Sequence, residues 1–116
     1  MNIVAIGAHP DDLEIFAYGF LAAASLRGDN LILGVATDGA AGGVNQGEEL
    51  VRQRAEEAKI GLAALGIPIM LDLPDGHLAD APNARNRIGD FIRNAAPDLV
   101  ITHAPEDYHP DHRALA

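Results

Sequence analysis

Two short histidine–carboxylate motifs stand near opposite ends of the chain. The first reads His-Pro-Asp-Asp at residues 9–12, and the second reads His-Pro-Asp-His at residues 109–112. Imidazole and carboxylate groups are the protein ligands of catalytic zinc, which keeps a further position open for water or substrate. Together the two motifs offer enough such groups to hold one metal ion and to leave others for acid–base chemistry.

The first motif alone supports two interpretations. Consecutive side chains point in different directions, so one of Asp11 and Asp12 could bind a metal ion with His9 while the other faces a water molecule. Alternatively, one aspartate only caps the helix that follows, and His9 is an ordinary loop residue. Short motifs often match by chance, so the spacing by itself leaves both interpretations open.

The second motif adds a pair of imidazoles. His109 and His112 are three residues apart at the start of a predicted helix, so both can face the same crevice. The pattern suggests one metal ligand and one acid–base group, with Asp111 orienting an imidazole. The alternative is a solvated turn, because residues 106–108 are polar. Two such motifs at neighbouring strand ends make coincidence much less plausible.

Apolar runs of strand length alternate with helical segments along the chain. Strands are predicted at 2–7, 31–37, 67–73 and 98–102, helices at 13–27, 48–65 and 83–95, and a last helix from Asp111. This order predicts a Rossmann-like α/β fold with three α/β/α layers and a mostly parallel sheet. With strand order 3-2-1-4, the first and fourth strands are neighbours at the switch point, where both motifs would meet.

The composition excludes several classes of protein. The 116 residues include 8 basic and 17 acidic side chains, a net charge of −9 that argues against nucleic acid or an anionic membrane as partner. There is no cysteine, and hence no disulfide and no thiolate site. Neither a signal peptide nor a membrane span is apparent, so we expect a cytoplasmic protein.

Few residues follow the second motif. We therefore expect residues 1–116 to form a single domain that is incomplete at its C-terminus after the fourth strand. A parallel sheet with an uncovered edge exposes apolar surface, and this predicts that the chain could associate with a partner or form a homo-oligomer.

The motifs resemble those of the PIG-L/LmbE-type zinc deacetylases, which remove acetyl groups from N-acetylglucosamine-type sugars. The resemblance rests on Gly-Ala-His-Pro-Asp-Asp-x-Glu at residues 7–14 and on His-Pro-Asp-His at 109–112. Weaker matches are Thr-Asp-Gly at 37–39, Arg-x-x-Glu at 54–57 and Leu-Pro-Asp-Gly at 73–76. Family members are much longer than this chain.

The resemblance implies a ligand set and a base. His9, Asp12 and His112 would bind one Zn²⁺ per chain, although other divalent transition metals suit such a site as well. Asp11 would be the general base that takes a proton from the zinc-bound water, and this water would attack the acetamide carbonyl.

The resemblance also implies groups around the substrate. His109 would stabilise the oxyanion and protonate the departing amine, which requires a largely protonated ring, and Asp111 would hold an imidazole in place. Arg54 and Asp38 would lie at the small acetamido-sugar substrate. For Arg54, a surface salt bridge with Glu57 is an equally supported interpretation.

Other interpretations concern the function as a whole and individual residues. The site chemistry also suits another amide or ester, and the alternative to an enzyme is a metal-binding but catalytically incomplete domain that needs a partner or its missing C-terminal half. His77 and His103 are interpreted as ordinary loop or strand-end residues, and Phe16 and Tyr18 as core or packing residues. The glycine-rich residues 39–43 are interpreted as a substrate-side loop, since they match no phosphate-binding motif.

Overall fold

Four parallel strands form the centre of the molecule. The computed structural model describes residues 1–41 and 47–116, and its strands are β1 (Asn2–Gly7), β2 (Asn30–Thr37), β3 (Ile69–Leu73) and β4 (Leu99–Ile101). They pair in the order β3-β2-β1-β4, which confirms the predicted strand order. The two strands that precede the histidine motifs, β1 and β4, are therefore direct neighbours.

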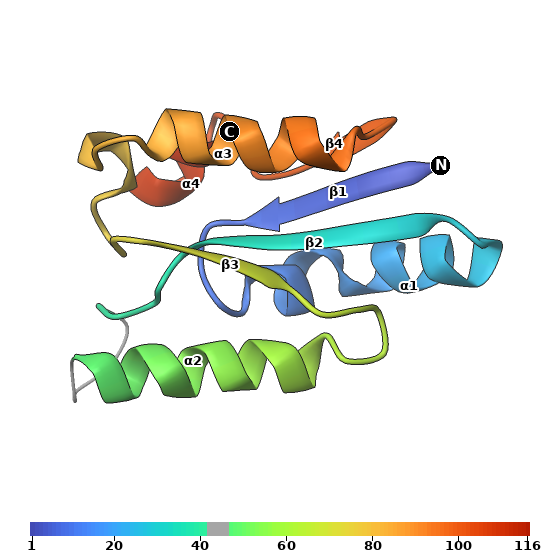
Figure 1. Cartoon of the computed structure of the whole chain (residues 1–116), viewed down its shortest axis with the longest axis horizontal. Helices are drawn as coiled ribbons and strands as arrows, with labels where there is room; N and C mark the ends of the chain where they lie inside the picture. The colour runs from blue at the N-terminus through green and yellow to red at the C-terminus, as the bar shows by residue number, and fades with distance from the viewer. Residues whose placement is uncertain (42–46) are drawn as a thin grey trace.

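Helices cover both faces of this sheet (Figure 1). Helices α1 (Tyr18–Arg27) and α2 (Glu48–Gly61) lie on one side, and α3 (Ala84–Ala95) and α4 (Pro110–Leu115) on the other. The buried apolar residues form two separate clusters, one beneath each helical layer. The predicted three-layer α/β/α architecture is thus confirmed. None of the helices in the described part of the chain has the length and apolar character to cross a membrane.

The apolar sequence of β1 follows from burial of the sheet on both faces. Val4 and Ile6 pack in the cluster beneath α3, whereas Ala5 packs in the cluster beneath α1. Such double burial is typical of central parallel strands. In the neighbouring strand, a Cβ on Gly34 would lie 2.6 Å from the ring of Phe91, so the missing side chain lets α3 approach the sheet closely.

The predicted helix 13–27 is interrupted near its start. Residues Leu13–Ala17 form a π-helical turn, η1, and its last residue, Ala17 (φ −123°, ψ −8°), leaves the helical conformation before α1 begins at Tyr18. The wider π-helical turn changes which residues face the core. Phe16 is 68% exposed, so its predicted place in the core is wrong, whereas Tyr18 packs against the core partly buried.

Other boundaries differ by a few residues. The predicted helix 48–65 ends at Gly61, because Leu62 leaves the helical conformation and turns into the core. The third and fourth strands are shorter than predicted, and a 3₁₀ turn, η2 (Leu78–Asp80), lies between β3 and α3. Of the predicted glycine-rich loop at 39–43, the structure describes residues 39–41. Residues 42–46 lie outside the described residues.

The loops at the carboxyl ends of the strands converge at one edge of the sheet (Figure 1). The turn after β3 is attached to α4, because Asp111 accepts the backbone N–H groups of Gly76 at 2.7 Å and Leu78 at 3.0 Å. The two histidine motifs therefore meet at the carboxyl ends of β1 and β4. This is the switch point of the sheet, where open parallel sheets favour a ligand site.

Candidate active site

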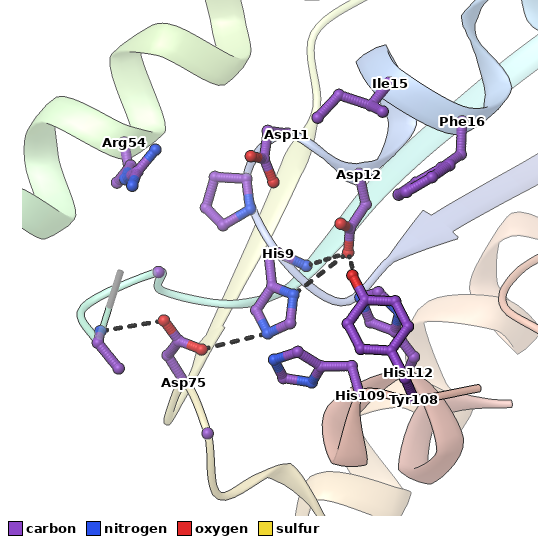
Figure 2. Close-up of a pocket in the computed structure, with 14 residues that line it drawn as sticks. His9, Asp11, Asp12, Ile15, Phe16, Arg54, Asp75, Tyr108, His109 and His112 are labelled. Atoms are coloured by element: carbon purple, nitrogen blue, oxygen red, sulfur yellow. Dashed lines mark hydrogen bonds and ion pairs between the residues drawn. The ribbon is translucent and has the colours of Figure 1, made fainter. Parts of the chain in front are cut away.

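Six of the predicted site residues line one cavity of about 390 Å³: His9, Asp11, Asp12, Arg54, His109 and His112. Figure 2 shows the imidazoles of His9, His109 and His112 gathered near the Asp12 carboxylate. The loop after β1 supplies the first three residues, the start of α4 supplies the two other imidazoles, and α2 supplies the arginine. The cavity thus joins residues that lie a hundred positions apart in the sequence.

Asp12 lies at ligand-like distances from both predicted imidazole ligands. Asp12 Oδ2 is 3.4 Å from His9 Nδ1 and 3.3 Å from His112 Nε2. Ligands that bind one tetrahedral zinc ion at 2.0–2.1 Å stand roughly 3.3 Å apart. Each of these two distances fits a pair of ligands on one ion. The groups whose ligand atoms all lie within 4.8 Å of one another include His9–His109–His112 and Asp12–His103–His112, so each predicted ligand belongs to at least one such group.

His112 is the residue that most clearly lacks a polar partner. Its ring is buried, and neither of its nitrogens makes a hydrogen bond within the described residues. Asp12 Oδ2 at 3.3 Å and Asp107 Oδ1 at 3.1 Å are close, but without the geometry of a hydrogen bond. Because buried imidazole nitrogens normally have a partner, this ring fits the role of a metal ligand.

The far side of the His9 ring faces two carboxylates. His9 Nε2 is 2.9 Å from Asp111 Oδ2 and 3.2 Å from Asp75 Oδ1. Histidines that bind a metal through one nitrogen usually donate the other N–H to such a carboxylate, which holds the ring in place. The structure therefore places Asp111 against His9. It also brings in Asp75, which sequence reasoning missed although its turn, Leu-Pro-Asp-Gly, belongs to the motifs quoted above.

The electrostatics of this cluster favour positive charge. Burial alone would lower the pKa of His9, but the hydrogen bonds with Asp12 and Asp111 and the charge of Asp75 raise it to about 9. Burial would raise the pKa of the Asp12 carboxyl, yet the imidazole of His103, followed by the imidazole and backbone N–H of His9, holds it well below its ordinary value. The pKa of Asp111 is lowered despite burial, because backbone N–H groups and His9 stabilise its anion. Anionic carboxylates around imidazoles are suited to a cation.

The predicted acid–base residues occupy the same cavity. Asp11 lines it with a carboxylate that stands apart from the Asp12 contacts (Figure 2). The His109 ring lies 4.4 Å from His9 and 4.8 Å from His112, measured between centroids. His109 Nδ1 accepts the backbone N–H of Asp111 at 3.1 Å, so the Nε2 end of this ring is the one that can serve a substrate.

The two predicted substrate residues are placed differently. Arg54 lines the cavity and also lies 3.7 Å from Glu57, so both interpretations offered for it are compatible with its position. Asp38 does not line the cavity: its Oδ1 accepts the N–H groups of Ala40 at 3.0 Å and Asp75 at 3.4 Å. Asp38 therefore shapes the loop that carries Asp75, and its contact with substrate stays a prediction.

His103 belongs to the imidazole cluster, which differs from the interpretation of this residue as an ordinary strand-end histidine. Its side chain is largely buried, and its ring stacks on His112 at 3.8 Å with an interplanar angle of 8°. Its Nε2 accepts the N–H of Ala8 at 3.0 Å and lies 3.2 Å from Asp12 Oδ2. The available signal was its position just after β4, at the edge where His9 leaves β1. His77 is exposed and does not line the cavity.

Comparison with known proteins defines the class. The chain matches the sequence profile of the PIG-L family, described as GlcNAc-PI de-N-acetylase, over residues 4–116. It therefore belongs to this family of deacetylases.

Individual relatives are longer than this chain. It is 33% identical over 123 residues to the uncharacterized deacetylase YaiS of Escherichia coli (strain K12), an alignment that covers 98% of this chain and 63% of YaiS. Among solved structures, the conserved protein TT1542 from Thermus thermophilus is 32% identical with a TM-score of 0.79, covering 99% of this chain and 51% of that one. The N,N'-diacetylchitobiose deacetylase from Pyrococcus horikoshii is 29% identical with a TM-score of 0.81, covering 97% and 45%. The chain thus spans about half to two thirds of these relatives.

Proposed function

We propose that this chain is a metal-dependent deacetylase that removes the N-acetyl group from an N-acetylglucosamine-type sugar or sugar conjugate. The observation that carries the proposal is the position of Asp12 Oδ2, within 3.4 Å of both His9 Nδ1 and His112 Nε2 on the wall of a cavity. Membership of a deacetylase family supports the reaction type.

His9, Asp12 and His112 would hold the metal ion. A bound divalent ion supplies Lewis acidity, which activates water and polarises a carbonyl. We propose zinc because two imidazoles and a carboxylate form an established type of catalytic zinc site, although iron, manganese and cobalt accept similar ligands.

Asp11 is assigned the role of general base. It lines the cavity beside Asp12, but its carboxylate stands apart from the contacts that occupy Asp12 (Figure 2). It can accept a proton from the attacking water while the acetamide carbonyl carbon gains its new bond to oxygen.

His109 is assigned to the oxyanion, as a hydrogen-bond donor. Its Nδ1 accepts a backbone N–H and therefore carries no proton, which places the proton of the neutral ring on Nε2. An Nε2–H donor can stabilise the oxyanion without a charged ring, so the requirement for a largely protonated imidazole falls away at that stage. When the amide C–N bond breaks, the departing nitrogen can take the proton that Asp11 accepted from the water, because a neutral imidazole that gave up its Nε2 proton would become an unfavourable anion.

The acetamido sugar is the finer part of the proposal. The cavity volume of about 390 Å³ lies in the range of small-molecule sites. A similar structure is named as a deacetylase of N,N'-diacetylchitobiose, which supports a sugar of this kind. Arg54 on the cavity wall offers guanidinium donors for hydroxyl or carbonyl oxygens of such a substrate.

The test is acetate release by the zinc-loaded chain from N-acetylglucosamine, N,N'-diacetylchitobiose, a simple N-alkylacetamide and an acetate ester. We expect acetate from at least one sugar, and loss of the activity after chelation of the metal. Acetate only from the alkylacetamide or the ester would overturn the sugar assignment in favour of another amide or ester. Unchanged activity after complete chelation would overturn metal dependence.

A metal-binding domain that does not turn over substrate by itself is the second candidate. It is favoured by the exposed apolar residues of the edge strand β4, where Leu99 is 38% and Val100 is 40% exposed. Such an edge is suited to pairing with further chain or with a second copy. One bound metal per chain, no acetate from any substrate, and a dimer in light scattering would support this candidate.

A further inference from the structure

His103 occupies a position that links the end of β1 to the metal-ligand cluster. It follows β4 by two residues and lies beside the carboxyl end of β1. The ladder between these strands stops at the pair Ala5–Ile101, so the backbone of Ala8 lies beyond the last partner that β4 offers. Ala8 is fully buried, and an N–H group at such a place needs an acceptor.

The imidazole of His103 supplies that acceptor. The N–H of Ala8 donates to His103 Nε2 at 3.0 Å, while the carbonyl of Ala8 accepts the N–H of Thr37 from β2 at 2.8 Å. Ala8 is thereby held from both sides. The next residue along the chain is His9, so these two hydrogen bonds determine where this predicted ligand leaves the sheet.

The same ring also restrains the second imidazole ligand. The faces of His103 and His112 are stacked with centroids 3.8 Å apart and nearly parallel. No hydrogen bond within the described residues orients the His112 ring, and this stacking is closer than the ring contacts of His112 with His109 and His9, so it contributes to limiting the rotation of His112.

The hydrogen bond to Ala8 decides the tautomer of His103. A nitrogen that accepts an N–H carries no proton, so the proton of the neutral ring lies on Nδ1. Nε2 also lies 3.2 Å from Asp12 Oδ2, but it then has no proton to donate to this carboxylate. Asp12 Oδ2 already accepts the backbone N–H of His9 at 2.8 Å. Asp12, His103 and His112 are close enough to share an ion, but the Nε2 lone pair of His103 accepts the N–H of Ala8, so we assign this ring to positioning and not to the ligand set.

We infer that His103 is a positioning residue of the metal centre: as the Nδ1–H tautomer it anchors the backbone next to His9 and holds the ring of His112 by stacking. The inference rests on the metal centre of the proposed function and extends it to a residue outside both histidine motifs. Groups that orient metal ligands typically contribute about 10- to 100-fold to metal affinity.

The first test separates the two contacts by substitution. His103→Phe keeps a flat ring against His112 and removes the acceptor, whereas His103→Gln keeps an acceptor at the position of Nε2 and removes the ring. The dissociation constant for Zn²⁺, measured by competition with a chromophoric chelator, should rise about 10- to 100-fold in His103→Phe. His103→Gln should recover much of this loss. His77→Phe and His77→Gln are matched controls at an exposed histidine and should bind zinc like the unsubstituted chain.

Two results would overturn the inference. Unchanged zinc affinity in His103→Phe would show that the acceptor has no positioning role. Complete loss of zinc in both His103 variants, with metal-free melting temperatures near that of the unsubstituted chain, would make His103 a ligand instead. If His103→Phe does not fold, the Gln variant decides: near-normal affinity supports the inference, and complete loss contradicts it.

A spectroscopic measurement tests the tautomer directly. A long-range ¹H–¹⁵N spectrum of the zinc-loaded chain should show His103 protonated at Nδ1, and a proton on Nε2 would contradict the assignment. Neither measurement uses acetate release. Failure of the deacetylase assay would therefore overturn the proposed function and leave this inference standing, whereas absence of zinc binding by the unsubstituted chain would overturn both.

Discussion

The carboxylates around the imidazole cluster differ in what they contact, and these contacts separate their roles. Asp12 lies between two imidazoles, and Asp111 contacts His9 together with two backbone N–H groups of the turn after β3. Asp11 lines the cavity beside them. Neutralising these carboxylates one at a time should therefore separate effects on metal binding from effects on turnover.

Asp11→Asn should keep the metal and lose turnover. Removal of a general base typically lowers the rate by about 10²- to 10⁴-fold, and Asp11 is not among the proposed ligands. The measurements are kcat for acetate release and zinc content per chain by elemental analysis. Asp80→Asn, at an exposed aspartate of η2, is the matched control. Near-normal kcat in Asp11→Asn would show that another group is the base.

The raised pKa of His9 predicts a pH dependence of stability in the metal-free chain. The pKa rises from 6.5 to about 9 on folding, so the protonated ring stabilises the folded state fully below pH 6.5. This contribution is lost as the pH rises toward 9, because the folded state must then release the proton. The free energy of unfolding, measured by urea titration from pH 6 to pH 9.5, should fall over this window. His9→Gln should flatten the curve, and an equal decline in that variant would assign the effect to another group.

Among the elements, the break between η1 and α1 shows why local sequence patterns were only partly sufficient. Residues 13–27 have the apolar spacing of one helix, but the chain forms a π-helical turn directly after Asp12. As a result, Ile15 and Phe16 are exposed and line the cavity instead of packing in the core. Spacing predicts that a helix forms, whereas the register of its first turn depends on contacts made after folding.

Close packing between β2 and α3 gives a prediction at this scale. In Gly34→Ala the new Cβ would lie 2.6 Å from the ring of Phe91, so either the ring or α3 must shift. Overpacking of this kind costs about 1–3 kcal/mol in the free energy of unfolding. Gly19→Ala is the matched control, since nothing lies within 4 Å of its Cβ. Urea unfolding measures both, and a Gly34→Ala variant as stable as the parent would contradict this close packing.

For the whole molecule, the central consequence of the fold is that one metal ion would join the two ends of the chain. The loop after β1 and the start of α4 contribute predicted ligands to the same cavity, across the pair β1–β4.

Membership of the deacetylase family and the strand order are established. Four expectations stay predictions: a single domain over residues 1–116, its incompleteness, a homo-oligomer and the cytoplasmic location.

Zinc should therefore stabilise the folded chain as a whole. A ligand that binds only the folded state at 100 times its dissociation constant adds about 2.7 kcal/mol, which raises the melting temperature. Chelation should reverse the rise, and His112→Ala should abolish it because it removes a ligand. His77→Ala is the control. Calorimetric melting with and without zinc provides the measurement, and an equal rise in His112→Ala would place the ion elsewhere.

The amino-acid sequence alone determined the alternation of strands and helices, the parallel sheet and the two motifs at neighbouring strand ends. These features follow from local apolar periodicity and from the right-handed connections of parallel strands, both of which can be seen along the chain. Only the tertiary structure decided that Asp111 contacts His9, that Asp75 joins them, and that His103 enters the cluster. These contacts join separate elements, so they depend on how loops close over the edge of the sheet. Close contacts between these side chains arise only when those elements pack together.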